Sequence, residues 1–305
     1  MSHSHDIKFI ERASLDIQKW DRCIETSPNG RLYAASFYLD YMALHWDALV
    51  LGDYEAVMPL TWNKKYGIRY LFQPFLTAQL GVFGKSLDSN VVASFITAIP
   101  REFRYADISL NAGNLFESMP GVTTRNNYVL PLDKPHTELF QSYKETTQRN
   151  IKKAAQSGCE VMRDIDVEQV IRLALHQMRA HGGESKDNTN RFRRLYQYLY
   201  ERKMAIAYGV SFQEQIVASC VFFLFQQRAY YILVGNHPNG KTIGASHTLI
   251  DAFIKDHAGS GMVLDFEGSD IRNLAFFYSS FGAVNEPYPA LKWNRLPFFL
   301  RWLKQ

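Results

Sequence analysis

The chain has 305 residues, of which 47% are hydrophobic, 21% charged and 14% aromatic. This apolar content excludes an intrinsically disordered chain, and the length predicts two domains. A membrane-spanning helix needs about 20 consecutive apolar residues, and no stretch of the chain approaches this length. The first residues lack the apolar core of a signal peptide. Cys23, Cys159 and Cys220 lie far apart, which argues against a disulfide framework or a cysteine-type zinc site. We therefore expect a soluble cytoplasmic protein.

The net charge of +4 is unevenly placed along the chain. Residues 134–203 hold 14 basic and 9 acidic side chains, a surplus of five, whereas residues 1–133 have a balance of −2 from 12 basic and 14 acidic residues. Such a surplus suits an anionic ligand or two solvated helix faces. It is too dilute to favour general nucleic-acid binding.

The first half of the chain begins with two short amphipathic helical patterns, at residues 15–26 and 36–45. Aromatic and β-branched runs at residues 46–51, 55–62 and 68–72 then predict an antiparallel meander. A helix at residues 89–99 and strands at residues 105–110 and 128–132 complete this half.

Residues 135–157 form the longest helical pattern, which ends at Gly158. A short strand at residues 159–163 and helices at residues 167–180 and 191–202 follow. Three further strands, at residues 204–211, 216–225 and 229–234, predict a second meander, and a glycine-rich segment follows at residues 235–244. The chain then predicts a helix at 245–257, a strand at 262–266, a helix at 270–281 and a strand at 283–286.

Both halves thus predict the same order of elements. The fold class is α/β with mixed sheets, arranged as two tandem domains, each a mostly antiparallel meander with flanking helices. A single large mixed domain is the alternative.

A glycine-containing segment between the second meander and its following helix is a candidate anion site. Glycines let the backbone turn tightly, so that successive N–H groups can point at one anion at the positive end of a helix. The residues are Gly240, Lys241, Thr242, Ile243, Gly244, Ala245 and Ser246. The segment is not a Walker loop, and an ordinary glycine turn is the alternative.

Three segments together resemble the Fem-type transferases, which carry two GNAT-like acyltransferase domains in tandem. The first is Lys241–Ser246, which matches the [QR]xxGx[GA] donor loop at Gly244. The second is Thr147-Gln-Arg149-Asn-Ile-Lys-Lys-Ala154 followed by Gly158, similar to the family's R-x-N-I-x-x-A…G helix. The third is Asp265-Phe-Glu-Gly268 followed by Phe277-Tyr-Ser-Ser-Phe-Gly, similar to the signature D-F-x-G…F-K-x-x-F-G. The resemblance covers residues from about 125 to 285.

The resemblance implies an N-terminal GNAT-like domain at residues 1–134, a connecting helix at 135–158 and a C-terminal GNAT-like domain at 159–305. It also implies an acyl-coenzyme A donor, such as acetyl-coenzyme A, on residues 240–246, and a small-molecule or peptide-like amine acceptor between the domains. Members that use aminoacyl-tRNA generally have Lys where this chain has Tyr278. A tRNA-dependent ligase of cell-wall precursors is therefore the second hypothesis, and a non-catalytic binding module is the third.

Attack of an amine on a thioester needs a base for the ammonium proton and an acid for the leaving thiolate. Asp265 and Glu267 alternate along a predicted strand, so both should project to one face. Glu267 is the candidate base, and Asp265 is a second carboxylate or a substrate-orienting group. Capping or salt-bridging roles are the alternatives for both. Tyr278 is the candidate acid, with a core position as its alternative.

Candidate acceptor-binding residues lie in both halves of the chain. Arg149 shares a helix face with Lys152 and Lys153, so it could clamp a phosphate or carboxylate with one of them. Gln73 belongs to a possible wall in the first domain, and His237 is an alternative base at a strand end. The other histidines lack metal-ligand spacing, so no metal is expected.

Overall fold

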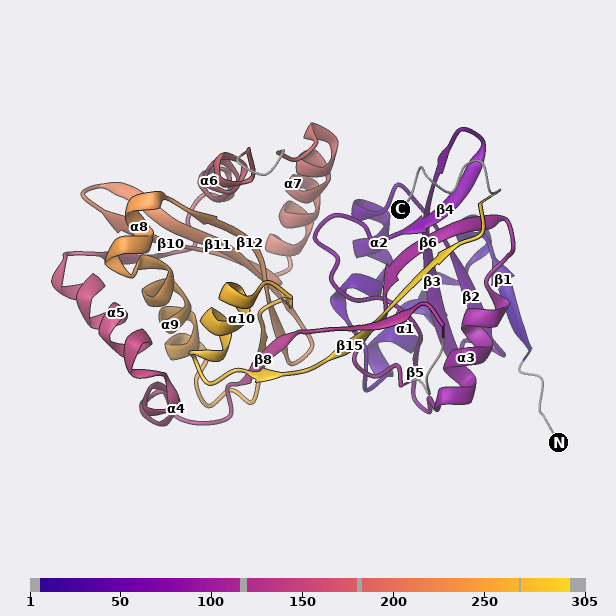
Figure 1. The fold of residues 1–305 in the computed structure, drawn as a ribbon, viewed down its shortest axis with the longest axis horizontal. Coiled ribbons are helices and arrows are strands. Elements are labelled where there is room, and N and C mark those ends of the chain that lie inside the picture. The colour runs from indigo at the N-terminus through magenta and orange to yellow at the C-terminus, as the bar shows by residue number, and fades with distance from the viewer. Residues whose placement is uncertain (1–5, 116–119, 180–182, 269, 297–305) are drawn as a thin grey trace. The chain divides into compact units, whose positions relative to one another are not determined.

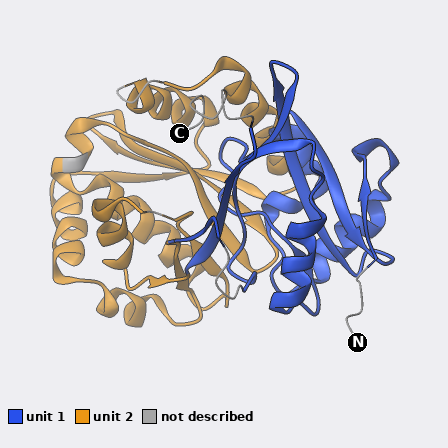
Figure 2. Ribbon diagram, turned by 45° about the vertical axis from the view of Figure 1, so that its right-hand side comes forward, with its two compact units in different colours: residues 1–125, 287–305 blue, residues 126–286 orange. Residues whose placement is uncertain are grey.

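The computed structural model describes residues 6–115, 120–179, 183–268 and 270–296. The chain forms two compact units, Met1–Arg125 with Pro287–Gln305 (unit 1) and Asn126–Glu286 (unit 2) (Figure 2). These limits differ from the predicted ones in two places. The segment from residue 126 to residue 158 lies in unit 2, and the segment after residue 286 returns to unit 1.

The described strands of unit 1 form one sheet in the order β1-β2-β3-β4-β6-β15-β7, with β5 paired to β3. Their bounds are β1 Ile7–Ile10, β2 His45–Leu51, β3 Ala56–Lys65, β4 Ile68–Phe72, β5 Phe83–Gly84, β6 Phe103–Ser109, β7 Val122–Arg125 and β15 Tyr288–Asn294. The α-helices are α1 Ile17–Thr26, α2 Ser36–Met42 and α3 Ser89–Ala98. Helix α3 begins where the Asp88 carboxylate accepts a hydrogen bond from the Val91 N–H, and it buries Phe95 in the core of this unit.

The described strands of unit 2 form a sheet in the order β14-β8-β13-β12-β11-β10-β9. Their bounds are β8 Tyr128–Pro131, β9 Glu160–Arg163, β10 Ala205–Phe212, β11 Gln215–Phe225, β12 Arg228–Asn236, β13 Val263–Asp265 and β14 Val284–Asn285. The helices are α4 His136–Ser142, α5 Glu145–Gln156, α6 Val167–Arg179, α7 Lys186–Tyr200, α8 Pro238–Ile243, α9 Ala245–His257 and α10 Arg272–Ser279.

The two units repeat one topology, which confirms the predicted fold class. In unit 1 the meander β2-β3-β4 is followed by α3 and by β6, which pairs in parallel with β4. In unit 2 the meander β10-β11-β12 is followed by α8, α9 and β13, which pairs in parallel with β12. Helices α6 and α7 lie on one side of the unit 2 sheet, and α5, α9 and α10 on the other (Figure 1).

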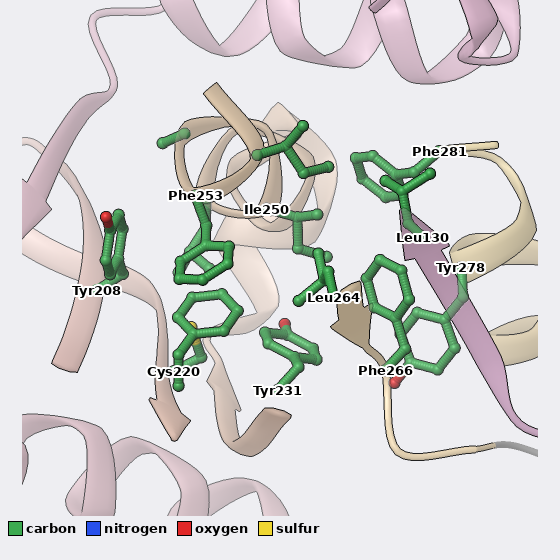
Figure 3. Close-up of a cluster of buried hydrophobic side chains, with 14 of the residues drawn as sticks. Leu130, Tyr208, Cys220, Tyr231, Ile250, Phe253, Leu264, Phe266, Tyr278 and Phe281 are labelled. Atoms are coloured by element: carbon green, nitrogen blue, oxygen red, sulfur yellow. The ribbon is translucent and has the colours of Figure 1, made fainter. Parts of the chain in front are cut away.

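An aromatic core fills the space between the unit 2 sheet and helices α9 and α10 (Figure 3). Phe222 of β11 and Phe253 of α9 stack with ring centroids 3.7 Å apart. Tyr231, Phe266 and Tyr278 extend the cluster toward the end of β13. This packing fixes α9 and α10, which carries Tyr278, relative to β13, at whose end Asp265 lies.

The predicted connecting helix at 135–158 is wrong in two respects. It is broken into α4 and α5, because Tyr143 and Lys144 are extended, and it packs within unit 2. Bonds to other parts of the unit favour the break: the Tyr143 hydroxyl donates to Asp251, and the Lys144 N–H donates to the carbonyl of Ser280. The periodic pattern could not reveal these partners, which lie more than 100 residues away.

Candidate active site

Helix α5 holds the third of the three motif segments through its N-terminal end. The Thr147 hydroxyl donates to the Ser280 hydroxyl oxygen over 2.7 Å, and the Lys144 N–H donates to the Ser280 carbonyl over 2.9 Å. Gly282 has a φ of +83°, and a Cβ there would lie 2.8 Å from the Ser142 hydroxyl oxygen. The segment that follows Tyr278 is therefore fixed against the α4–α5 junction.

The same helix holds the glycine-containing segment through its middle. Gly244 has a φ of +82°, and a Cβ there would lie 2.4 Å from the carbonyl oxygen of Asn150. The Lys153 ammonium donates to the Thr242 carbonyl over 2.8 Å. Asn150 Nδ2 lies 3.3 Å from Nε2 of His247 in the first turn of α9. Helix α5 thus brings the three motif segments together, although they are far apart in the sequence.

The predicted open glycine loop is mostly helical, which corrects that expectation. Residues 238–243 form α8, Gly244 is a left-handed turn, and α9 begins at Ala245. Gly240 is required because a Cβ would lie 2.4 Å from the Val217 carbonyl oxygen. Both glycines thus permit close backbone contacts, which leaves the first turn of α9 as the part of the segment that can offer backbone N–H groups.

The other residues of this segment differ in exposure. Thr242 is exposed and its hydroxyl donates to the Asn239 carbonyl, whereas Ala245 is fully buried. Ile243 is partly buried against the aromatic core. The Ser246 hydroxyl donates to the side-chain oxygen of Asn236 over 2.6 Å. The side chain of Lys241 lies outside the described part of the structure.

Glu267 lies just beyond β13 and not on it. Its backbone has a φ of +66°, a conformation that costs about 1–2 kcal/mol for a residue with a side chain. The Glu267 N–H donates to Asp265 Oδ1 over 2.9 Å, which holds this turn. The expected alternation of Asp265 and Glu267 along one strand face is therefore wrong, since β13 ends at Asp265.

The two candidate acid–base groups both lie near the end of β13, on either side of Phe266. The Tyr278 ring stacks on Phe266 with centroids 4.7 Å apart, and the side chain is buried. Burial, with the nearby Glu267 carboxylate, raises the pKa of Tyr278 to about 12. Burial also raises the pKa of Glu267 well above its usual value. Perturbed groups of this kind, placed together, are typical of catalytic sites.

Asp265 has buried structural partners. Its carboxylate forms an ion pair with Arg228 at 2.5 Å, and the same guanidinium pairs with Glu286 at 3.0 Å. The Asp265 side chain is only 2% exposed. The salt-bridging alternative therefore describes this residue, and its second role is to hold the turn at Glu267.

Comparison with known proteins agrees with this geometry. Residues 141–272 match the family described as the acetyltransferase (GNAT) domain. The matched region lies within unit 2. No curated protein matches the sequence.

Solved structures extend the likeness to the whole chain. FemX is similar with a TM-score of 0.65 at 12% identity, covering 98% of this chain and 100% of that one. A tandem GNAT protein from the clavulanic acid biosynthesis pathway is similar with a TM-score of 0.56 at 10% identity, covering 96% and 99%. L-PGS from Bacillus licheniformis has a TM-score of 0.51 at 11% identity, covering 94% and 93%. The fold is therefore that of the Fem-like tandem GNAT proteins.

The candidate acceptor residues are not brought together by the structure. Arg149 of the GNAT domain has Glu145 as its neighbour, at 3.9 Å, and Lys152 is exposed. Lys153 supports α8 as described above. His237 precedes α8 and accepts a hydrogen bond from the Asn239 N–H at Nδ1. The predicted clamp of Arg149 with a lysine has no support in these contacts.

Gln73 lies in unit 1, outside the GNAT domain of unit 2. Its side-chain oxygen accepts a hydrogen bond from the Ser109 N–H over 3.1 Å, which joins the end of β4 to β6. Ordinary packing, the alternative for this residue, accounts for that contact.

Sequence reasoning missed His247 as a member of this site. Its ring packs edge-on against Phe277 with centroids 4.8 Å apart, beside the candidate acid. Burial lowers the pKa of His247 to about 4, so the ring is neutral at physiological pH. No local signal could have found it, because its partner Asn150 lies 97 residues away.

Within the described residues, no group of three His, Cys, Asp or Glu side chains is arranged to hold a metal ion. None of the described helices is long and apolar enough to cross a membrane.

Proposed function

We propose that this protein transfers an acyl group from acyl-coenzyme A to the amine of a small-molecule or peptide-like acceptor. The observation that carries the proposal is the position of Glu267 and Tyr278 at the end of β13, where the Tyr278 ring stacks on Phe266, in the unit whose residues 141–272 match a GNAT domain. Acyl-coenzyme A is made in the cytoplasm, which is where we expect the protein to act.

The chemistry divides between these two residues. The amine nitrogen attacks the thioester carbon, the C–S bond breaks, and the sulfur leaves as thiolate. The Glu267 carboxylate accepts the proton that the amine loses; its raised pKa strengthens it as a base. The Tyr278 phenol, protonated at neutral pH, donates a proton to the thiolate. Asp265 positions Glu267 through the bond to its N–H and does not touch the substrate.

The donor would bind at the junction of α8 and α9. In the first turn of α9 the His247 N–H donates to the Gly244 carbonyl over 3.1 Å, so the N–H groups of Ala245 and Ser246 are those that would bind the pyrophosphate of coenzyme A. Thr242 lies exposed on α8 beside this turn. A negative charge at this position should repel the pyrophosphate without disturbing the core.

A thermal-shift titration with coenzyme A and acetyl-coenzyme A tests the proposal. The Thr242→Glu variant adds the charge, and Thr242→Gln is the matched neutral control. We expect a dose-dependent rise in Tm for the wild type and for Thr242→Gln, and a Kd at least 5-fold weaker for Thr242→Glu. No rise at millimolar ligand would refute the donor assignment.

Two other outcomes separate the remaining hypotheses. Retention of charged tRNA, with steep salt dependence and no response to coenzyme A, would favour the aminoacyl-tRNA-dependent reaction on a cell-wall precursor. A rise in Tm with coenzyme A, together with no thiol release from acetyl-coenzyme A for any amine of a panel, would favour a ligand-binding module.

A further inference from the structure

A pocket of about 550 Å³ lies in unit 2 between α6, the β10–β11 turn and the end of β12. Its polar lining includes Gln169, Arg172 and His176 of α6, Glu214 of the β10–β11 turn, and His237 at the end of β12. Helix α6 packs on β12, since a Cβ on Gly235 would lie 2.6 Å from the Ala174 nitrogen. Figure 1 shows α6 on the opposite side of the sheet from α9 and α10.

The lining of this pocket includes one guanidinium, from Arg172, two imidazoles, from His176 and His237, and one carboxylate, from Glu214. Arg172 and His176 lie one turn apart on α6 and are exposed. Within the described part of the chain, neither side chain forms a hydrogen bond or ion pair. A guanidinium in a concave site is suited to bind a phosphate or carboxylate with two parallel hydrogen bonds.

The turn that closes the pocket is strained. Gln213 and Glu214 have φ values of +51° and +62°. Two-residue hairpin turns with this conformation strongly prefer Asn-Gly or Asp-Gly. The chain instead presents Glu214 to the pocket, and residues held in such conformations cluster at ligand sites.

Unit 1 has a counterpart at the equivalent place. A pocket of about 570 Å³ lies between α1 and the β2–β3 turn, and it is lined by Lys19, Arg22, Cys23 and Thr26 of α1. These positions have the same spacing as the four α6 residues of the first pocket, and Arg22 corresponds to Arg172. In the unit 1 pocket, the Lys19 ammonium is paired with the Asp53 carboxylate at 2.6 Å, and Glu55 adds a second carboxylate. Lys85 also lines the unit 1 pocket, so both pockets combine basic with acidic side chains.

We propose that the unit 2 pocket binds a small ligand through an oxyanion, a phosphate or carboxylate held by Arg172 with His176 and His237. Glu214 opposes a bare anion and selects a ligand that also carries an amine or hydroxyl group. His237 joins this site to the proposed donor segment, because it precedes α8 and the neighbouring Asn236 accepts a hydrogen bond from Ser246. The site itself includes neither Glu267 nor Tyr278.

Calorimetric titration of the full chain tests this site, with inorganic pyrophosphate and citrate as separate probes. Arg172→Gln should weaken binding of the preferred probe at least tenfold. Arg179→Gln removes the same charge from the same helix outside the pocket and should change Kd less than twofold. Glu214→Gln removes a repulsive carboxylate and should tighten binding two- to fivefold. The probe that binds more tightly identifies the oxyanion class.

Three results would overturn the site. The first is no binding of either probe at 10 mM, and the second is an equal loss in Arg172→Gln and Arg179→Gln. The third is weaker binding of the probe to Thr242→Glu together with unchanged binding to Arg172→Gln, which would place the anion at the proposed donor segment. Failure of coenzyme A to bind would leave this site unaffected, so the two proposals fail separately.

Discussion

Replacing Gly244 by alanine tests the contact that organises the GNAT domain. The substitution places an L residue at a φ of +82°, which costs about 1–2 kcal/mol. The new Cβ would also lie 2.4 Å from the carbonyl oxygen and 2.9 Å from the carbonyl carbon of Asn150. Both are backbone atoms of α5, so the helix must shift, and overpacking of this kind costs about 1–3 kcal/mol more.

Gly259 provides the matched control, because its φ is +76° and nothing lies within 4 Å of its would-be Cβ. Gly259→Ala therefore has the backbone cost alone. Urea unfolding followed by fluorescence should show the difference between the two variants. With a slope of about 2 kcal/mol per molar, an additional 2 kcal/mol lowers the midpoint by about 1 M. Equal midpoints for the two variants would refute the close packing of α5 on Gly244.

Three further changes probe the same domain. Glu267→Gln should raise the urea midpoint more at pH 9 than at pH 5. Folding raises the pKa of Glu267, so the wild-type protein has its full stability below the pKa of this residue in the unfolded chain. That stability is lost as the pH rises through the pKa of Glu267 in the folded protein. A difference independent of pH would contradict this. Arg228→Met should cost about 3–5 kcal/mol in urea unfolding, because Asp265 stays buried without its partner; a loss below 1 kcal/mol would contradict it. Tyr278→Phe should lower turnover about 100-fold in a thiol-release assay with little change in Tm, and unchanged turnover would exclude the acid role.

The elements of this chain were largely predictable because the apolar patterns that define them are local. Both meanders, the helix after each and the parallel strand that follows are encoded in short runs of aromatic, β-branched and turn residues. The broken helix at Tyr143 and the helical α8 were not predictable in this way. In each, bonds to distant residues such as Asp251 and Ser280, or a close backbone contact such as Gly240 with Val217, decide the conformation.

The candidate site was predictable in part, for the same reason. Motif resemblance indicated Glu267 and Tyr278, and in the structure the Tyr278 ring stacks on Phe266, the residue that precedes Glu267. The role of Asp265 depends on Arg228, which lies on another strand, and His247 depends on Asn150 of α5. Such partners are set by the fold, and one sequence alone does not reveal them.

Strand β15 has a consequence for how the protein is made. It is the last described element of the chain, yet it pairs with β6 and β7 inside the sheet of unit 1. A ribosome releases the N-terminal segments first, so until residues 288–294 emerge, β6 lacks one neighbour and β7 has no partner among the described strands. Unit 1 must then wait, incomplete, while all of unit 2 is synthesised. Nascent chains stalled before residue 287 should expose the edge of β6 to chaperones or to other chains, and loss of the C-terminal strand should damage the N-terminal half of the protein.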